Sequence, residues 1–153
     1  MDVVEHRRAS RVLLLDESDR ILLFRGCDPR KPEEKYWFSV GGGVNPGETD
    51  ADAAVRELRE ETGLVATVED LVGPVFTEVS EFDFDGRHLR QENVYFVFRV
   101  NDPVIETSGF EAYEVDTMDR HTWWSLSELR ATSEVFYPRV LVSLLSEIVC
   151  RPH

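Results

Sequence analysis

The chain has 153 residues, which suffices for one domain with a sizeable core and leaves little room for a second. Thirty acidic residues against seventeen Lys and Arg give a formal charge of −13, so long-range repulsion makes duplex nucleic acid a poor partner. The sequence contains no apolar run that approaches the ~18 residues needed to cross a bilayer, and its two cysteines cannot form a disulfide framework. We therefore expect one cytoplasmic domain, residues 1–153, with no membrane partner.

The first half of the chain predicts two strands and a helix. Residues 9–15 and 21–25 are apolar strand candidates separated by a polar turn. Further along, Thr49 has the character of a helix N-cap, and a helical pattern runs from about Asp50 to Thr62. Gly63 is well placed as the left-handed residue that ends this helix.

The second half predicts a hairpin, another strand and a second helix. Residues 71–84 and 88–100 alternate apolar and polar side chains around an Asp-Gly pair, which is typical of a tight hairpin turn. Residues 121–126 predict a short strand, and residues 137–149 show helical spacing of apolar side chains. Strands mixed with two principal helices predict an α/β fold, an α/β/α sandwich with a mixed sheet between the helices.

Three carboxylates gather on the predicted helix of the first half. Glu57, Glu60 and Glu61 stand at i, i+3 and i+4, so they share one helix face and repel one another. A divalent cation would relieve that repulsion, and carboxylate oxygens suit Mg²⁺ or Mn²⁺. The helix alone also fits a solvated acidic face, so the residues around it must decide.

The residues around this helix form an extended motif. Nine positions match the pattern G-x5-E-x7-R-E-U-x-E-E-x-G-U, where U is a bulky apolar residue; they are Gly42, Glu48, Arg56, Glu57, Leu58, Glu60, Glu61, Gly63 and Leu64. From ordinary residue usage, a chance match at a given start has a probability on the order of one in 10⁹. The motif resembles the signature of the Nudix hydrolases. The resemblance implies the Nudix fold and a magnesium-dependent hydrolase, with Mn²⁺ as a substitute.

The resemblance also implies roles for the motif residues. Glu57, Glu60 and Glu61 would hold the metal, together with a backbone carbonyl of the glycine loop at Gly42. Gly43 would let the backbone come close to the substrate. Outside this group, the family pattern places Glu48 within reach of Arg56, a pair that braces the loop against the helix.

The general base is left open by the sequence. In the family it comes either from the acidic helix or from a glutamate on a later loop, so Glu57, Glu60 and Glu61 remain candidates. Among later residues we favour Glu114, in a segment that also holds Glu111 and Asp116. Glu92 is a further candidate, and for each of these later acids the alternative is an ordinary solvated side chain.

Two residues before the motif are candidates for substrate contacts. Arg25 ends a predicted strand where relatives often place a basic phosphate contact, but it is equally typical of a surface arginine. Trp37 precedes the glycine loop and has a ring that could stack on a base or sugar, although an aromatic residue at such a position is more often part of the core.

The leading functional hypothesis is an enzyme that cleaves the phosphoanhydride bond of a nucleoside diphosphate linked to another group. The alternative from a different class is a Nudix-fold module that senses a nucleotide without catalysis. An isomerase of the same fold would need a catalytic cysteine, for which Cys27 has no recognisable base nearby. Homodimers are common in the family, so a homodimer stays open, and the groups attached to the diphosphate are not readable from the motif.

Overall fold

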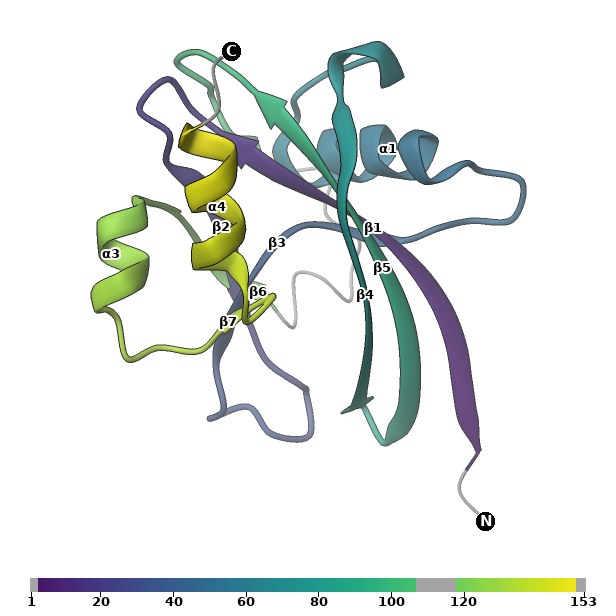
Figure 1. The fold of residues 1–153 in the computed structure, drawn as a ribbon. Coiled ribbons are helices and arrows are strands. Elements are labelled where there is room, and N and C mark those ends of the chain that lie inside the picture. Colours follow the sequence, from purple (N-terminus) through teal and green to yellow (C-terminus); the bar gives the residue numbers. More distant parts are fainter. Residues whose placement is uncertain (1–2, 107–117, 151–153) are drawn as a thin grey trace.

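The computed structural model describes residues 3–106 and 118–150 (Figure 1). Their strands are β1 (Val4–Leu15), β2 (Ile21–Gly26), β3 (Tyr36–Gly43), β4 (Val72–Phe84), β5 (Arg87–Arg99), β6 (Met118–Trp124) and β7 (Phe136–Tyr137). Their helices are α1 (Asp50–Thr62), α3 (Leu126–Ala131), α4 (Leu141–Cys150) and the single 3₁₀ turn η1 (Val68–Asp70). These strands form one mixed sheet in the order β4-β5-β1-β2-β3-β7, with β6 paired to β2 and an additional pairing of β1 with β3.

Two apolar clusters lie on opposite faces of the sheet because successive side chains of a strand alternate in direction. In β1, Val12 and Leu14 belong to the cluster under α1, whereas Leu13 and Leu15 belong to the cluster that contains the apolar residues of α3 and α4. Figure 1 shows α1 on one side of the sheet and the two later helices on the other. The predicted α/β/α sandwich with a mixed sheet is confirmed.

The ends of α1 confirm the signals in the sequence. The Thr49 side chain accepts a hydrogen bond from the Asp52 backbone N–H, and the Asp52 side chain accepts one from the Thr49 N–H. Gly63 ends the helix with a φ of 78°, and its N–H donates to the Arg59 carbonyl. An N-cap side chain such as that of Thr49 stabilises a helix by about 1 kcal/mol. The acidic helix is therefore fixed at both ends by its own sequence.

The predicted hairpin is confirmed as β4 and β5. Asp85 and Gly86 form its turn with φ values of 50° and 77°, as a two-residue turn with positive φ at both positions requires. β4 lies at one edge of the sheet, and β5 pairs with β1 in parallel along the whole length of β1.

The sequence prediction did not include β3 as a strand, and it misplaced the first residue of two other elements. β1 begins at Val4 rather than at residue 9, because its polar first half pairs with β5 and needs no apolar face there. α4 begins at Leu141 rather than at residue 137, because Tyr137 pairs with β3 as part of β7 and Pro138 follows it. Of the helices described, none has the length and apolar character needed to cross a membrane.

Candidate active site at the glycine strand and the acidic helix

Two carboxylates of α1 lie under the sheet rather than in solvent. Glu57 and Glu61 are only 5% and 1% exposed, whereas the Glu60 side chain is about one third exposed, at 30%. A solvated acidic face would leave all three side chains in water. Burial of ionised carboxylates is costly without compensating partners, so the contacts of Glu57 and Glu61 matter for function.

The glycines that end β3 make this burial feasible. The Gly41 N–H donates a 2.8 Å hydrogen bond to Glu61 Oε1. A Cβ atom at Gly42 would stand only 2.6 Å from Glu57 Oε1, so any side chain there would displace the carboxylate. The bare backbone at Gly41 and Gly42 therefore lets the strand lie directly against both acids.

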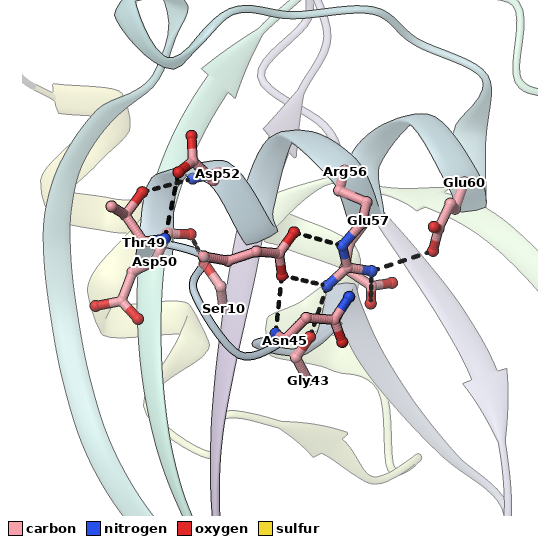
Figure 2. Close-up of polar contacts among 10 residues, drawn as sticks. Ser10, Gly43, Asn45, Thr49, Asp50, Asp52, Arg56, Glu57 and Glu60 are labelled. Atoms are coloured by element: carbon pink, nitrogen blue, oxygen red, sulfur yellow. Dashed lines mark hydrogen bonds and ion pairs between the residues drawn. The ribbon is translucent and has the colours of Figure 1, made fainter.

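Arg56 joins the helix to the loop that precedes it (Figure 2). Its Nε and Nη2 donate to the two oxygens of Glu48 at 2.7 and 2.9 Å, and Nη2 also donates to the Gly43 carbonyl at 2.7 Å. These bonds confirm the predicted pair of Glu48 with Arg56. The guanidinium holds the pKa of the Glu48 carboxyl below its ordinary value, mainly through the side-chain hydrogen bond, and the same bond raises the pKa of Arg56.

The same guanidinium also contacts two of the three helix acids. Arg56 Nη1 lies 2.9 Å from Glu57 Oε1 and 3.3 Å from Glu60 Oε2. Within residues 3–106 and 118–150, no three Asp, Glu, His or Cys side chains converge closely enough to hold a metal ion as they stand. The donor set is nevertheless of the right chemistry, since it offers hard carboxylate oxygens and adjacent glycine carbonyls of β3. Glu60 would have to turn from Arg56 towards Glu57 and Glu61.

Arg25 and Trp37 lie on the sheet face opposite α1. The Arg25 guanidinium is 5.9 Å from the centre of the Trp37 ring, and the two residues are paired between β2 and β3. Trp37 is 3% exposed, packs edge-on against Trp124 at 5.1 Å, and donates its indole N–H to Glu134. This placement favours core packing over base stacking for Trp37, and it counts against a contact of Arg25 with a phosphate at the acidic helix.

Of the later candidates for the general base, only Glu92 lies among the described residues. Glu111, Glu114 and Asp116 lie outside the described residues. Glu92 is exposed on β5, where it pairs in register with Arg8 of β1.

One acidic residue near α1 carried no signal in the sequence. The Glu106 N–H donates to the Thr62 carbonyl at 2.7 Å, and its Cβ is 2.8 Å from the place that a Gly63 Cβ would take. Glu106 therefore lies against the C-terminal end of the acidic helix. It follows β5 in an irregular stretch with no periodicity and no motif, so only the fold identifies it.

Comparison with proteins of known sequence places these features in a family. A Nudix hydrolase of Bacillus subtilis named YvcI, described as uncharacterised, is 35% identical over 85 residues, which cover 56% of this chain and 48% of that protein. The nucleoside triphosphatase NudI of Salmonella arizonae is 28% identical over 129 residues, which cover 71% of this chain and 89% of NudI. The chain spans about half the length of YvcI and about two thirds of the length of two other curated relatives.

Solved structures show the same fold. The dihydroneopterin triphosphate pyrophosphohydrolase of E. coli superposes with a TM-score of 0.64 at 18% identity, covering 95% of this chain and 97% of that one. A MutT/nudix family protein from Enterococcus faecalis gives a TM-score of 0.68 at 15% identity, covering 97% of this chain and 64% of the other. The family model of the NUDIX domain matches residues 5–144, a stretch that includes β3 and α1. The chain belongs to the Nudix family.

Proposed function

We propose that this protein is a metal-dependent hydrolase that cleaves the phosphoanhydride bond of a nucleoside diphosphate linked to another group. The observation that carries the proposal is the pair of buried carboxylates, Glu57 and Glu61, held against the bare backbone at Gly41 and Gly42. Membership of the Nudix family supports pyrophosphate-bond hydrolysis in general. Relatives named nucleoside triphosphatase and CTP pyrophosphohydrolase support a nucleotide as substrate.

Glu57, Glu60 and Glu61 would hold Mg²⁺ or Mn²⁺, together with the carbonyl of Gly42. When bound, such a cation neutralises the diphosphate oxygens and lowers the pKa of a coordinated water. Arg56 contributes in the absence of the cation, because its guanidinium offsets the charge of Glu57 and Glu60 and reduces the repulsion between them. Glu48 in turn fixes Arg56 and the loop, so it positions the ligands rather than binding metal itself.

A carboxylate must accept a proton as water attacks phosphorus, and the products are two phosphate-terminated fragments. The acidic helix supplies candidates in Glu57, Glu60 and Glu61, and Glu114 stays our proposal for a base outside the helix. Glu106 adds a second candidate outside the helix, because it lies at the C-terminal end of α1. Comparing kcat and metal affinity in Glu114→Gln and Glu106→Gln separates these candidates, since loss of a base lowers kcat at unchanged metal affinity.

The test of the proposal is product release from a panel of nucleoside triphosphates, nucleotide sugars, dinucleotides and oxidised nucleotides. We expect turnover with Mg²⁺ or Mn²⁺ and none in excess EDTA, because the proposed ligands are carboxylates that need a divalent cation to act. Undiminished turnover in EDTA would contradict the metal mechanism. Tight nucleotide binding without any turnover in Mg²⁺ would instead support a nucleotide-sensing module.

A further inference from the structure

Arg11 of β1 donates hydrogen bonds to the backbone of β3, beside the carboxylates of the proposed site. Its Nη1 lies 3.0 Å from the Gly41 carbonyl oxygen and 3.4 Å from the Ser39 carbonyl oxygen. These two acceptors belong to the peptide groups on either side of the Val40–Gly41 peptide, whose N–H donates to Glu61. The Arg11 side chain therefore fixes the peptide groups before and after the one that holds a proposed metal ligand.

The bonds from Arg11 take the place of a neighbouring strand at one edge of β3. The Trp37 N–H donates to the carbonyl of the residue before β7, so Trp37 faces β7. Alternate residues of a strand direct their backbone groups to the same edge, which places those of Ser39 and Gly41 there too. β7 pairs with the two residues of β3 that precede Ser39. Among the described residues, the side chains of Arg11 and Glu61 complete this edge at Gly41.

The absence of a side chain at Gly41 lets the Arg11 stem pass close to the backbone of β3. A Cβ atom at Gly41 would stand 2.8 Å from Arg11 Cδ and would overlap the Ser10 carbonyl oxygen. The φ of Gly41, 143°, also lies in a region that favours glycine. Because a glycine backbone has wide conformational freedom, the contacts of Gly41 must set the direction of its N–H.

The neighbouring Ser10 ties the same part of β1 to the acidic helix. Its side chain is fully buried, and its Oγ donates a 2.6 Å hydrogen bond to the Asp50 carbonyl at the start of α1 (Figure 2). Successive side chains of a strand alternate in direction, so Ser10 is directed towards α1 and Arg11 away from it. Two consecutive residues of β1 thus hold α1 and β3, the two elements whose spacing decides where Glu61 lies against Gly41.

We propose that Arg11 is a positioning residue that orients the Gly41 N–H towards Glu61 and thereby sets the direction of this carboxylate for a divalent cation. The inference rests on the proposed function, in which Glu61 is a metal ligand. Ligand side chains are oriented by their outer hydrogen bonds, and loss of such a partner commonly lowers metal affinity or activity by about 10- to 100-fold. Arg11 acts through Gly41, so its role requires no contact with the substrate or the cation.

The first measurement is hydrogen exchange of the Gly41 amide in EDTA, in wild type, Arg11→Met and Arg11→Lys. Methionine keeps an unbranched stem and removes the donors, so the Gly41 amide should exchange at least about tenfold faster, as the loss of a charged hydrogen bond predicts. Arg11→Lys retains a charged donor and should restore part of the protection. The Leu144 amide of α4 serves as the reference for general stability. No increase at Gly41, or an equal increase at Leu144, would overturn the inference.

The matched control is Arg99→Met. It removes an arginine of β5 whose guanidinium donates to Asp19 rather than to β3. We expect this variant to leave exchange of the Gly41 amide relative to that of Leu144 as it is in wild type, even where it lowers the free energy of unfolding. Selective acceleration at Gly41 in Arg99→Met would overturn the assignment to Arg11.

The second measurement is Mn²⁺ affinity, followed by electron paramagnetic resonance of the free ion without substrate. We expect Arg11→Met to bind Mn²⁺ roughly 10- to 100-fold more weakly, and Arg99→Met to bind it as wild type does. At saturating Mn²⁺, the KM of a substrate that is turned over should change by less than about threefold in Arg11→Met, because Arg11 does not bind the substrate. A large rise in KM at unchanged Mn²⁺ affinity would overturn the positioning role and indicate a substrate contact.

These outcomes separate failure of this inference from failure of the proposed function. If exchange at Gly41 and Mn²⁺ affinity both depend on Arg11 in a protein without turnover, the positioning role stands and hydrolysis is overturned. If turnover needs Mn²⁺ but Arg11→Met leaves Mn²⁺ affinity unchanged, hydrolysis stands and the positioning role is overturned. A wild-type protein that binds no Mn²⁺ would overturn both.

Discussion

At the residue scale, Glu61 is the carboxylate whose surroundings are most telling. It is 1% exposed and accepts a hydrogen bond from the Gly41 N–H. An ionised carboxylate is costly to bury, so this position is an unusual one for a glutamate. Glutamine would keep the accepting oxygen and remove the charge.

We therefore predict that Glu61→Gln lowers turnover by on the order of 100-fold or more while the metal-free fold is retained. The free energy of unfolding without metal should stay equal or rise, because one buried charge is gone and its repulsion with Glu57 is relieved. Steady-state kinetics and denaturant unfolding in EDTA measure the two effects. Glu69→Gln, an exposed acid of η1, is the control; near-normal rates in Glu61→Gln would show that this acid does not serve catalysis.

Removing the charge of Glu48 should change the free energy of unfolding in the opposite direction, by lowering it. Its carboxylate receives two bonds from Arg56, and its pKa is lowered from an ordinary 4.5. A lowered pKa in the folded state means that the pair stabilises the fold above about pH 4.5 and that this contribution is lost as the pH falls through the lowered value.

We predict that Glu48→Gln costs roughly 1–3 kcal/mol of unfolding free energy at pH 7. Because the wild-type carboxylate becomes protonated in acid, the difference from wild type should shrink as the pH falls below about 4.5. Urea unfolding of both proteins from pH 3 to 7 measures this. A difference that is independent of pH would contradict the assignment of the lost stability to the ion pair with Arg56.

At the scale of elements, the site depends on how closely β3 lies on α1. A methyl group at Gly42 would meet Glu57 at 2.6 Å, whereas one at Gly43 would meet only the flexible end of Arg7 at 3.3 Å. The two neighbouring glycines thus offer a matched pair of variants.

We predict that Gly42→Ala costs roughly 1–3 kcal/mol by overpacking, and that metal affinity falls because Glu57 is displaced. Gly43→Ala should cost less than about 1 kcal/mol, since a side-chain end can move aside. Thermal unfolding and Mn²⁺ titration of both variants provide the comparison. Equal losses of stability and of Mn²⁺ affinity in the two variants would mean that Gly42 is not needed for the close packing of β3 against Glu57.

The sequence predicts the local features of these elements better than their positions relative to one another. The motif and the capping residues predicted α1, its ends at Thr49 and Gly63, and the pairing of Glu48 with Arg56, because all of these are local in the chain. The burial of Glu57 and Glu61 depends on where β3 lies, which the motif spacing does not state. Arg25 lies on the face opposite α1 because of strand alternation, and that face can be assigned only when the cores are known.

At the scale of the whole molecule, the open edge of the sheet bears on assembly. β4 carries Glu78, Glu81 and Asp83 along its length at that edge. Pairing this strand with the β4 of a second copy would bring like charges together, which opposes edge-to-edge association. The homodimer that the family resemblance left open stays a prediction, and the acidic edge disfavours β4 as its interface.

The parallel pairing of β1 with β5 also has a consequence for the order in which the molecule is made. Val4 pairs with His88, and the register continues to Leu15 with Arg99, so every pair joins residues 84 positions apart. During synthesis the whole motif, including the acidic helix, emerges before β5 exists, and the closing of so long a loop is slow compared with local pairing. The basic half of β1 gains its strand partner only when β5 is complete. The carboxylates of α1 are thus present in the nascent chain well before the first half of β1 has its strand partner.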